Sequence, residues 1–366
     1  MKNRIKVLFA LPLMNAGGAE RIVCTLLKFL DREKFSLILL LLEKKGAFLD
    51  CVPEDVYIYE LKRSSLKSSV FPLIKAIREL KPDIVFSTIG SMNLLIASVR
   101  RFLPERIKFV ARETNLVSLK NRDEKYPLLF DFLFKTVYKN FDLIICQSRD
   151  MLEDLRQNYF IPSFKMKIIN NPVDIEEIEK RAFCESEVLD KRFFNVVAVG
   201  SLTEKKGFDL LIKALFLSED KDIFLTIIGE GKEREKLQTL AKKLKTDNKI
   251  RFVGFKKNPY PYIKEADLLA LSSRYEGFPN VLLEANALGV PVLAFRCKGG
   301  INEIVLEGIN GWSVESFDIF EFAEKLEKIK RISFDKSAIK KSVEDRYLVF
   351  KIVKKYEEIL ENLYKG

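Results

Sequence analysis

The sequence predicts an α/β protein with two domains, each built on a doubly wound parallel sheet. Short apolar segments rich in β-branched residues alternate with amphipathic segments along the whole chain. This alternation is typical of parallel strands that are covered by helices on both faces. The chain has 366 residues, more than one ordinary hydrophobic core requires. We expect the two sheets to face a central cleft at the carboxyl ends of their strands, the usual ligand site in this architecture.

The first half of the chain supplies the first domain. The segments between its strands carry apolar residues at helical spacing, as in Glu20–Leu30, Phe71–Leu80 and Asn93–Phe102. The expected strands are Ile5–Ala10, Phe35–Leu42, Val56–Tyr59, Ile84–Ser87, Lys108–Ala111, Leu143–Gln147 and Lys167–Ile169.

The second half repeats this arrangement. Helical spacing is found in Phe208–Leu217, Glu233–Leu244 and Pro279–Leu288. The expected strands are Asn195–Val199, Phe224–Ile228, Ile250–Val253, Leu268–Leu271 and Val292–Phe295.

The domain boundary is expected where a charged stretch, Ile175–Arg192, separates the two sets of strands. We therefore place an N-terminal domain at residues 1–172 and a C-terminal domain at residues 173–346. The last segment, residues 347–366, has a helical pattern that is too long and too charged for another sheet element. We expect a helix there that crosses back to the N-terminal domain.

The composition excludes several kinds of active site. The chain contains no histidine, which excludes a Ser-His-Asp triad, a His-ligated metal and a His acid or base. The five cysteines are scattered without the spacing of metal ligands, which suits a reduced cytoplasm. An apolar run such as Leu37–Leu42 is far too short to span a membrane. We interpret the apolar start of the chain as a first strand rather than a signal peptide.

The excess positive charge lies in the first half. Residues 1–170 contain 29 Lys and Arg against 19 Asp and Glu, whereas the rest contains 34 against 33. Such an excess suits a membrane surface, a polyphosphate lipid or a nucleic acid. Leu61–Lys67 and Val99–Lys108 place cations beside apolar residues, which indicates either contact with an anionic membrane or ordinary solvated helix ends. No nucleic-acid motif accompanies the charge, so we expect no nucleic-acid partner.

The segment most informative about function is residues 272–284, Ser-Ser-Arg-Tyr-Glu-Gly-Phe-Pro-Asn-Val-Leu-Leu-Glu. Pro279 has the position of a first-turn helix proline, so that Glu276 precedes the helix and Glu284 lies about a turn inside it. A helix N-terminus binds anions, and carboxylates beside it would accept hydrogen bonds from hydroxyl groups. A phosphate combined with a polyol indicates a sugar nucleotide.

Two turns between a strand and a helix are candidates for contact with the same ligand. Gly17 and Gly18 let the backbone approach a ligand closely. Lys206, in the loop from Gly200 to Gly207, is placed to neutralise a phosphate. The alternative for the glycine pair is an ordinary turn, and the alternative for Lys206 is a solvated surface lysine, which is what we expect of the neighbouring Lys205.

Two further motifs carry weaker signals. Gly229 lies in another turn between a strand and a helix, where it either lines the cleft or only forms the turn. Asp220 and Asp222 match the Asp-x-Asp pattern of metal-dependent sugar transferases. They directly precede a strand, at the opposite end of the sheet from the expected site, so we expect a solvated turn and no metal site.

Together these motifs resemble the retaining glycosyltransferases of family 4, which have the two-domain GT-B fold. The match extends over nearly the whole chain, and the pair of glutamates separated by seven residues is its specific part. Gly289–Val292 and Lys298–Ile304 also resemble the family, and the branch resembled builds bacterial surface polysaccharides and lipid-linked oligosaccharides. The four main motifs are Gly17–Arg21, Asn171–Asp174, Gly200–Gly207 and Glu276–Glu284.

The resemblance implies a role for each matched residue. The catalytic candidates are Glu276, which would bind hydroxyls of the donor sugar, and Lys206, which would stabilise the departing diphosphate. Glu284 would accept hydrogen bonds from the ribose hydroxyls. The other donor-binding candidates are Gly17, Gly18, Ser201, Gly229, Phe278, Pro279 and Asn280. The candidates on the acceptor side are Arg112, Glu113 and Asn115.

Two positions depart from the family pattern. Ser201 stands where the family usually has an arginine, so one cation fewer faces the leaving group unless Lys205 or another residue replaces it. Thr114 stands at a strand end where many relatives carry a histidine. The second difference is expected to affect only the choice of acceptor.

The resemblance implies transfer of a hexose or N-acetylhexosamine from a nucleoside-diphosphate sugar, expected to be UDP-linked, to a hydroxyl of a lipid-linked glycan. The anomeric configuration would be retained, and no cofactor or metal would be required. A same-face mechanism, in which the leaving phosphate oxygen takes the acceptor proton, fits a site without histidine. The expected location is the cytoplasm, at the inner face of the membrane. The alternative is an inactive sugar-nucleotide-binding partner of another glycosyltransferase.

Overall fold

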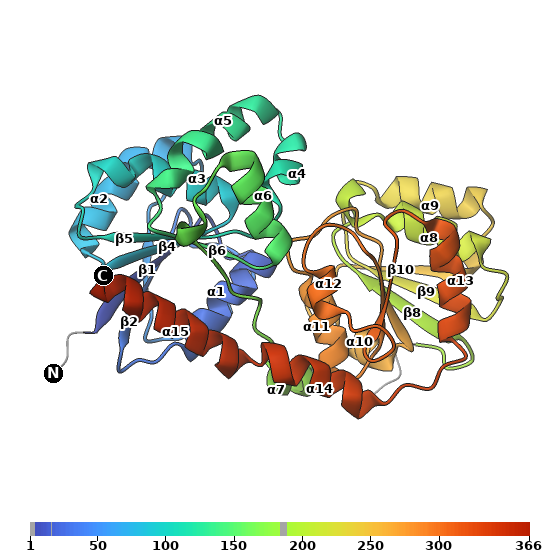
Figure 1. Cartoon of the computed structure of the whole chain (residues 1–366). Helices are drawn as coiled ribbons and strands as arrows, with labels where there is room; N and C mark the ends of the chain where they lie inside the picture. Colours follow the sequence, from blue (N-terminus) through green and yellow to red (C-terminus); the bar gives the residue numbers. More distant parts are fainter. Residues whose placement is uncertain (1–3, 16, 184–188) are drawn as a thin grey trace. The chain divides into compact units, whose positions relative to one another are not determined.

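The computed structural model describes residues 4–15, 17–183 and 189–366. The chain divides into two compact units (Figure 1). Unit 1 comprises Met1–Pro172 and Val349–Gly366, and unit 2 comprises Val173–Leu348. Each unit contains one parallel sheet with helices on both faces, which confirms the predicted pair of doubly wound domains.

The sheet of unit 1 has seven parallel strands in the order β3-β2-β1-β4-β5-β6-β7. Each predicted strand of the first half is present, with ends displaced by at most one residue. The chain order reverses between β1 and β4, so the loops after these two strands lie at the switch point of the sheet. The strands are β1 (Ile5–Leu11), β2 (Phe35–Leu41), β3 (Tyr57–Glu60), β4 (Ile84–Thr88), β5 (Lys108–Arg112), β6 (Leu143–Cys146) and β7 (Met166–Ile168).

Helices cover both faces of this sheet. In Figure 1, α2 and α3 lie on one face and α1 and α15 on the other. The predicted helix Asn93–Phe102 begins earlier, at Gly90, and its last three residues form a 3₁₀ turn. The helices are α1 (Gly18–Phe29), α2 (Val70–Leu80), α3 (Gly90–Val99), α4 (Val117–Arg122), α5 (Pro127–Val137), α6 (Arg149–Tyr159) and α15 (Val349–Lys365).

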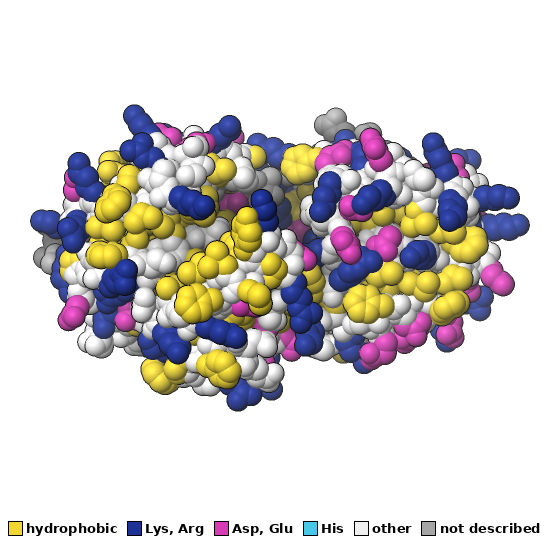
Figure 2. All heavy atoms as spheres, turned by 90° about the horizontal axis from the view of Figure 1, so that it is seen from above, with side chains coloured by type: hydrophobic (Ala, Val, Ile, Leu, Met, Phe, Trp, Pro, Cys, Tyr) yellow, Lys and Arg dark blue, Asp and Glu magenta, His cyan; other side chains and the backbone are white. Residues whose placement is uncertain are grey.

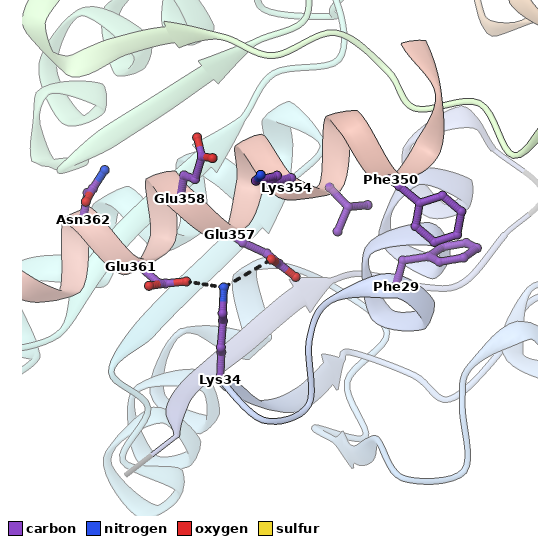
Figure 3. Close-up of a pocket in the computed structure, with 9 residues that line it drawn as sticks. Phe29, Lys34, Phe350, Lys354, Glu357, Glu358, Glu361 and Asn362 are labelled. Atoms are coloured by element: carbon purple, nitrogen blue, oxygen red, sulfur yellow. Dashed lines mark ion pairs between the residues drawn. The ribbon is translucent and has the colours of Figure 1, made fainter. Parts of the chain in front are cut away.

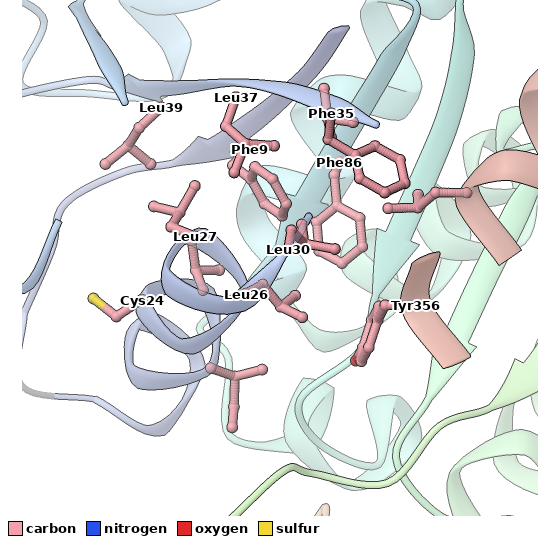
Figure 4. Close-up of a cluster of buried hydrophobic side chains, with 14 of the residues drawn as sticks. Phe9, Cys24, Leu26, Leu27, Leu30, Phe35, Leu37, Leu39, Phe86 and Tyr356 are labelled. Carbon is pink, nitrogen blue, oxygen red and sulfur yellow. The ribbon is translucent and has the colours of Figure 1, made fainter. Parts of the chain in front are cut away.

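The C-terminal helix α15 completes the core of unit 1. Its residues Ile352 and Tyr356 are fully buried in the same hydrophobic cluster as Phe9, Leu26 and Phe86 (Figure 4). This cluster joins β1, β2 and β4 to α1 and α15, segments from both ends of the chain. The apolar face of α1 therefore packs between the sheet and a helix that is more than three hundred residues away in sequence.

Polar contacts along the edge of α15 fix its position against α1. Lys34 lies 2.9 Å from the carboxylate of Glu361 and 3.6 Å from that of Glu357 (Figure 3). Phe29 and Phe350 meet edge to face, with ring centroids 5.3 Å apart. These side chains line a groove of about 520 Å³. Because the ion pairs are partly exposed, the buried apolar contacts provide most of the stabilisation.

The sheet of unit 2 has six parallel strands in the order β10-β9-β8-β11-β12-β13. The five predicted strands are present. The sequence reading missed β13, because its four residues begin with a glycine after an asparagine and resemble a turn. The strands are β8 (Phe194–Val199), β9 (Ile223–Ile228), β10 (Ile250–Gly254), β11 (Leu268–Leu271), β12 (Val292–Phe295) and β13 (Gly311–Val314).

The helices of unit 2 pack on two hydrophobic clusters, one on each face of the sheet. In the described part of the chain, no helix combines the length and the apolar character that crossing a bilayer would require. The helices are α7 (Ile175–Arg181), α8 (Phe208–Leu217), α9 (Arg234–Lys243), α10 (Tyr260–Glu265), α11 (Asn280–Ala287), α12 (Ile301–Ile304), α13 (Ile319–Ile329) and α14 (Lys336–Tyr347).

The role of α15 leads to a test of stability. Ile352→Ala would remove buried methyl groups and leave a cavity in unit 1, so we expect the free energy of unfolding of unit 1 to fall by about 2–5 kcal/mol. Hydrogen exchange at the amides of β1 and α1, measured by mass spectrometry, locates the effect. The exposed Lys355→Ala on the same helix is the control. Unchanged protection in Ile352→Ala would contradict the assignment of α15 to this core.

Candidate functional site

The site lies at the switch point of the sheet in unit 2. The chain order reverses between the neighbouring strands β8 and β11, so the loops that follow them emerge side by side at the carboxyl edge. The first loop, residues 200–207, leads into α8, and the second, residues 272–279, leads into α11. These are the two loops that the sequence selected in this domain.

Gly207 allows the two loops to approach closely. Its φ is +62°, a conformation that favours glycine. A Cβ atom at this position would lie 2.0 Å from the carbonyl oxygen of Ser272. The hydroxyl of Ser272 donates to the carbonyl oxygen of Lys206 at 3.0 Å, which joins the loops next to Gly207.

Arg274 provides a second link between the loops. Its guanidinium donates two hydrogen bonds of 2.9 Å to the carboxylate of Asp209, at the start of α8. Its backbone N–H donates to the carbonyl oxygen of Lys205 at 2.8 Å. A bidentate pair of this kind fixes orientation as well as distance. Sequence reasoning missed Arg274 and Asp209, because no spacing relates two residues that meet only across the sheet.

Lys206 and Glu276, the two predicted catalytic residues, form an ion pair. The Nζ of Lys206 lies 2.6 Å from Oε1 of Glu276, and the hydroxyl of Ser273 donates to the same oxygen at 2.7 Å. The side chain of Glu276 is 7% exposed and that of Lys206 is 20% exposed. A nearly buried carboxylate is thus held by one charged and one neutral donor.

The ion pair determines the protonation state of Glu276. Burial alone would raise the pKa of this carboxyl. The positive charges of Lys206 and Lys205, with hydrogen bonds from Lys206 and Ser273, outweigh burial and lower the pKa to about 2. At neutral pH Glu276 is therefore an ionised hydrogen-bond acceptor and cannot donate a proton.

Lys205 differs from its expected position as a solvated surface lysine. Its Nζ lies 3.9 Å from Glu276 and 4.8 Å from the centre of the Tyr275 ring, and its side chain is 22% exposed. Two lysines therefore converge on one carboxylate, although the family's usual arginine is replaced by Ser201. Ser201 itself is exposed, and its carbonyl oxygen accepts from the N–H of Thr203.

Two glycines of the Lys298–Ile304 motif support the backbone around Glu276. A Cβ at Gly299 would lie 2.2 Å from the carbonyl oxygen of Glu276, and one at Gly300 would lie 2.2 Å from the ring of Phe278. The N–H of Glu276 donates to the carbonyl oxygen of Lys298 at 3.0 Å. The motif thus packs closely against the loop that carries Glu276 and supports it.

The helix that follows Glu276 begins at Asn280, with Pro279 as the residue just before it. Pro279 is therefore one position earlier than the first-turn proline that the sequence predicted. Pro279, at the N-cap position, has no polar side chain to cap the first turn, and the positive end of the helix dipole lies next to the loop that carries Glu276. Glu284 is buried on the second turn, and the ring of Phe278 packs edge to face on Tyr347.

Gly229 supports the site from the neighbouring strand. It follows β9 with a φ of +149°, and a Cβ there would lie 1.8 Å from the carbonyl oxygen of Gly200. The loop that leads to Lys206 passes directly over this glycine. The structure thus gives Gly229 a packing role, while its expected contact with the donor stays a prediction.

Gly17 and Gly18 lie in unit 1, after β1. Gly17 precedes α1, and a Cβ there would lie 2.3 Å from a carboxylate oxygen of Glu20. Glu20 is itself buried, which raises the pKa of its carboxyl. The backbone of Gly17 is extended, and the side chain of Glu20 folds back over it, while the expected contact of these glycines with a donor phosphate stays a prediction.

Arg112 and Glu113 occupy opposite faces of the sheet, because successive strand residues alternate in direction. Arg112 is 1% exposed and donates to the hydroxyl of Tyr356 at 3.1 Å and to the side-chain oxygen of Asn171 at 2.5 Å. Arg112 therefore links α15 to Asn171, which lies next to the end of the Met1–Pro172 segment of unit 1. This corrects the expected placement of Arg112 on the acceptor side.

Glu113 and Asn115, the other acceptor-side candidates, line a pocket of about 180 Å³. Glu113 accepts hydrogen bonds from Asn93, at 2.9 Å, and from the hydroxyl of Tyr138. Burial raises the pKa of Glu113 to about 7, although the hydrogen bond from Asn93 opposes the shift. Aromatic residues from α5, Phe130 and Phe134, form another side of the pocket.

No cluster of potential metal ligands occurs among the described residues. Asp220 and Asp222 form ion pairs with Lys330, at 2.8 and 3.2 Å. These aspartates precede β9, at the amino edge of the sheet. The Asp-x-Asp segment is thus engaged by a lysine, away from the carboxyl edge that carries the candidate site.

Comparison with known proteins identifies the family. Residues 16–177 match the family described as Glycosyltransferase Family 4, and residues 179–344 match Glycosyl transferases group 1. The chain is 32% identical over 313 residues to the N-acetylgalactosamine-N,N'-diacetylbacillosaminyl-diphospho-undecaprenol 4-alpha-N-acetylgalactosaminyltransferase of Campylobacter jejuni, covering 82% of this chain and 84% of the relative. The chain belongs to the family 4 glycosyltransferases.

Other similar proteins agree with this assignment. The amylovoran biosynthesis glycosyltransferase AmsD of Erwinia amylovora is 25% identical over 297 residues, 80% of each chain. The structure of Anabaena HepE in complex with UDP and glucose superposes with a TM-score of 0.81 at 20% identity, over 98% of this chain and 100% of HepE. The GT-B fold that was expected for this family 4 glycosyltransferase is thereby confirmed.

The contact at Gly207 gives a matched pair of variants in this glycosyltransferase. Gly207 and Gly308 both have positive φ, of +62° and +74°, but a Cβ at Gly308 would have no neighbour within 4 Å. Gly308→Ala should cost about 1–2 kcal/mol of stability from its backbone conformation alone. Gly207→Ala should cost more, because its methyl group overlaps the Ser272 carbonyl. Urea unfolding measures the difference, and equal costs would contradict the role assigned to this contact.

The ion pair predicts a pH dependence of stability. The folded pKa of Glu276, about 2, lies below the ordinary value of 4.5. Its stabilising contribution is therefore complete above pH 4.5 and is lost as the pH falls towards 2, by about 3 kcal/mol in total. In urea unfolding across this range, Glu276→Gln should show a shallower pH dependence than the parent chain. The exposed Glu358→Gln should follow the parent, and an unchanged slope in Glu276→Gln would contradict the assignment.

Proposed function

We propose that this glycosyltransferase transfers a hexose or N-acetylhexosamine from a UDP-linked donor to a hydroxyl of a lipid-linked glycan, with retention and without a metal. The product would belong to bacterial surface polysaccharide or glycan synthesis. The observation that carries the proposal is the ion pair of Lys206 and Glu276 beside the first turn of α11. A carboxylate, cations and a helix N-terminus at one edge of a sheet suit a ligand with hydroxyls and phosphates.

The charges of the site suit a departing diphosphate. Lys206 and Lys205 lie within 4 Å of Glu276 and supply two positive charges, and the first turn of α11 adds backbone N–H groups. Fixed donors of this kind stabilise the charge that develops on the leaving group without reorganisation. They also supply the positive charge that a metal ion provides in other transferases, which supports a metal-independent reaction.

Glu276 is suited to holding the donor sugar. A carboxylate with a pKa of about 2 accepts hydrogen bonds from hydroxyls and does not donate a proton at neutral pH. Ser273 and Lys206 fix one of its oxygens. The other oxygen lies 3.9 Å from the Nζ of Lys205 and is the one that we assign to the donor sugar.

Retention follows from a same-face reaction in this proposal. The bond from the anomeric carbon to the diphosphate oxygen breaks, and the bond to the acceptor oxygen forms on the same face of the sugar. The acceptor proton passes to the leaving phosphate oxygen. This route needs no general base from the protein, which suits a site built from a lysine pair and an ionised carboxylate without histidine.

The proposed substrates follow two similar proteins. The name of the Campylobacter jejuni relative specifies transfer of N-acetylgalactosamine to a diphospho-undecaprenol-linked sugar, and HepE was solved with UDP. A lipid-linked acceptor would be reached from the inner face of the cytoplasmic membrane. The net charge of +11 favours contact with an anionic surface there.

An inactive, sugar-nucleotide-binding partner subunit is the alternative function. Its support is Ser201, in the position of the family's usual arginine. The position of Lys205 weakens this support, because a second cation already lies 3.9 Å from Glu276. Donor binding without any transfer or donor hydrolysis by the purified chain would favour the inactive partner.

The test is transfer from UDP-sugars to a diphosphate-linked acceptor, with the anomeric configuration of the product read by NMR. Lys206→Ala and Glu276→Ala should each reduce turnover by about 10²- to 10³-fold, the loss typical of one preorganised contact to the transition state. Each removes a group that stabilises the diphosphate or holds the sugar. Addition of a chelator should leave the rate unchanged.

The control variants lie on α9 of the same unit. Lys242→Ala and Glu235→Ala remove an exposed lysine and an exposed glutamate and should leave turnover unchanged. Near-parental turnover in Lys206→Ala or Glu276→Ala would overturn the role of that residue. An inverted product would overturn retention, and loss of activity with the chelator would overturn metal independence.

A further inference from the structure

The helix α5 in unit 1 presents apolar side chains to solvent. Leu128 is 85% exposed, Phe132 is 61% exposed, and Tyr126 and Leu129 are more than half exposed. Eight of the eleven residues of α5 are apolar. An isolated exposed leucine is ordinary, but four large apolar side chains on one short segment form a patch that marks an interaction site.

The opposite face of α5 accounts for its attachment to unit 1. Phe134 is buried against Tyr138 and Tyr159, and α5 contacts α3, α4 and α6. Asp131, the acidic residue of α5, accepts hydrogen bonds from Asn121 and Tyr159 on this inner side. Packing within unit 1 involves only the inner face of α5, so it does not explain why the residues of the outer face are also apolar.

Positive charge surrounds the outer face. Arg122, Lys125, Lys135 and Lys139 are all exposed on α5 or directly next to it. The acidic residues nearby are largely engaged: Asp131 is turned inward and Glu124 pairs with Lys120. Figure 2 views the side of the molecule that carries α5, and hydrophobic side chains gather there among lysines and arginines. Apolar residues ringed by cations are complementary to an anionic lipid surface.

We propose that the outer face of α5, formed by Leu128, Leu129 and Phe132 together with Tyr126 just before the helix, inserts into the interface of an anionic bilayer. This inference rests on the membrane-linked acceptor of the proposed function and specifies the surface that makes the contact. An interfacial helix lies in the membrane plane, with apolar side chains among the acyl chains and cations at the headgroups.

The segments selected from sequence are less suited to this contact. In Leu61–Lys67, Leu61 is buried, and in Val99–Lys108, Val99 and Leu103 are buried. Their apolar residues face the interior of unit 1, which leaves mainly the cations outside. Only Phe102 in these two segments is a large apolar side chain with substantial exposure, at 47%.

The pocket beneath α5 links this surface to the substrate. Phe130 and Phe134 of α5, Lys120 of α4 and Glu124 just after α4 line the 180 Å³ pocket together with Asn115. The pocket and the apolar patch are therefore two sides of the same helical segment. A lipid-linked acceptor could place its polar head in the pocket while its chain stays in the bilayer beside α5.

A fluorescence experiment measures insertion directly. Trp312 is the single tryptophan of the chain and lies in unit 2. In a Trp312→Phe background, Phe132→Trp would place the reporter on α5. With vesicles containing anionic lipid and brominated acyl chains, we expect strong quenching of this variant and little quenching of Trp312 in the parent chain. Equal quenching of the two would overturn the proposal.

A second experiment links insertion to activity. In Leu128→Ser/Phe132→Ser, co-flotation with anionic vesicles and transfer to a lipid-linked acceptor in those vesicles should each fall about tenfold or more. Transfer to a water-soluble, short-chain acceptor should stay within about twofold, because the substituted side chains lie outside the pocket. The control, Phe320→Ser/Ile332→Ser, changes exposed apolar residues of unit 2 and should behave as the parent.

The outcomes separate this inference from the proposed function. If the parent chain transfers sugar to neither acceptor, the proposed function is refuted. If Leu128→Ser/Phe132→Ser floats with vesicles as the parent does, only the assignment of α5 as the membrane-binding surface is refuted. Lipid-free self-association that this double substitution abolishes would show that a second copy covers the patch, and would also overturn the proposal. A circular dichroism spectrum like that of the parent confirms that the variant is folded.

Discussion

The ion pair between Lys206 and Glu276 is the interaction on which the organisation of unit 2 depends. It is nearly buried and lies between loops that come from two neighbouring strands. To bring these loops together, the chain uses a glycine at residue 207, a bidentate link from Arg274 to Asp209, and glycines at 299 and 300. Each of these features would be costly on its own. Together they hold a carboxylate ionised in a place where burial alone would favour its neutral form.

The strand positions and the selection of Lys206 and Glu276 as individual residues were predictable from the sequence, because both depend on local pattern. Buried parallel strands are short apolar runs, and a glutamate before a helix is visible in the primary structure. The contacts of Lys206 with Glu276 and of Arg274 with Asp209 were not predictable, since they arise only when β8 and β11 become neighbours. Arg112 shows a different limit. Its motif position suggested a ligand, but strand alternation turns it away from Glu113 and towards Tyr356.

Membrane contact illustrates the same limit on a larger scale. The sequence located the excess charge in the first half of the chain, but charge alone does not reveal which apolar residues are exposed. In α5 the inner and outer faces are both apolar, so hydrophobic periodicity could not separate the packed side from the free side. Only the packing of Phe134 against its aromatic neighbours shows which side is covered. The surface proposed for lipid therefore follows from tertiary structure.

The contribution of α15 to unit 1 has a consequence for synthesis of the chain. Unit 2 is continuous, so all of its residues have been translated once Leu348 is added. Unit 1 is not, because Ile352 and Tyr356 complete a core that otherwise consists of residues from the first half. During translation, the apolar surface of α1 that α15 covers in the folded chain stays exposed until all of unit 2 has been synthesised. Emergence of α15 from the ribosome is thus the step that allows unit 1, which is made first, to complete its core last.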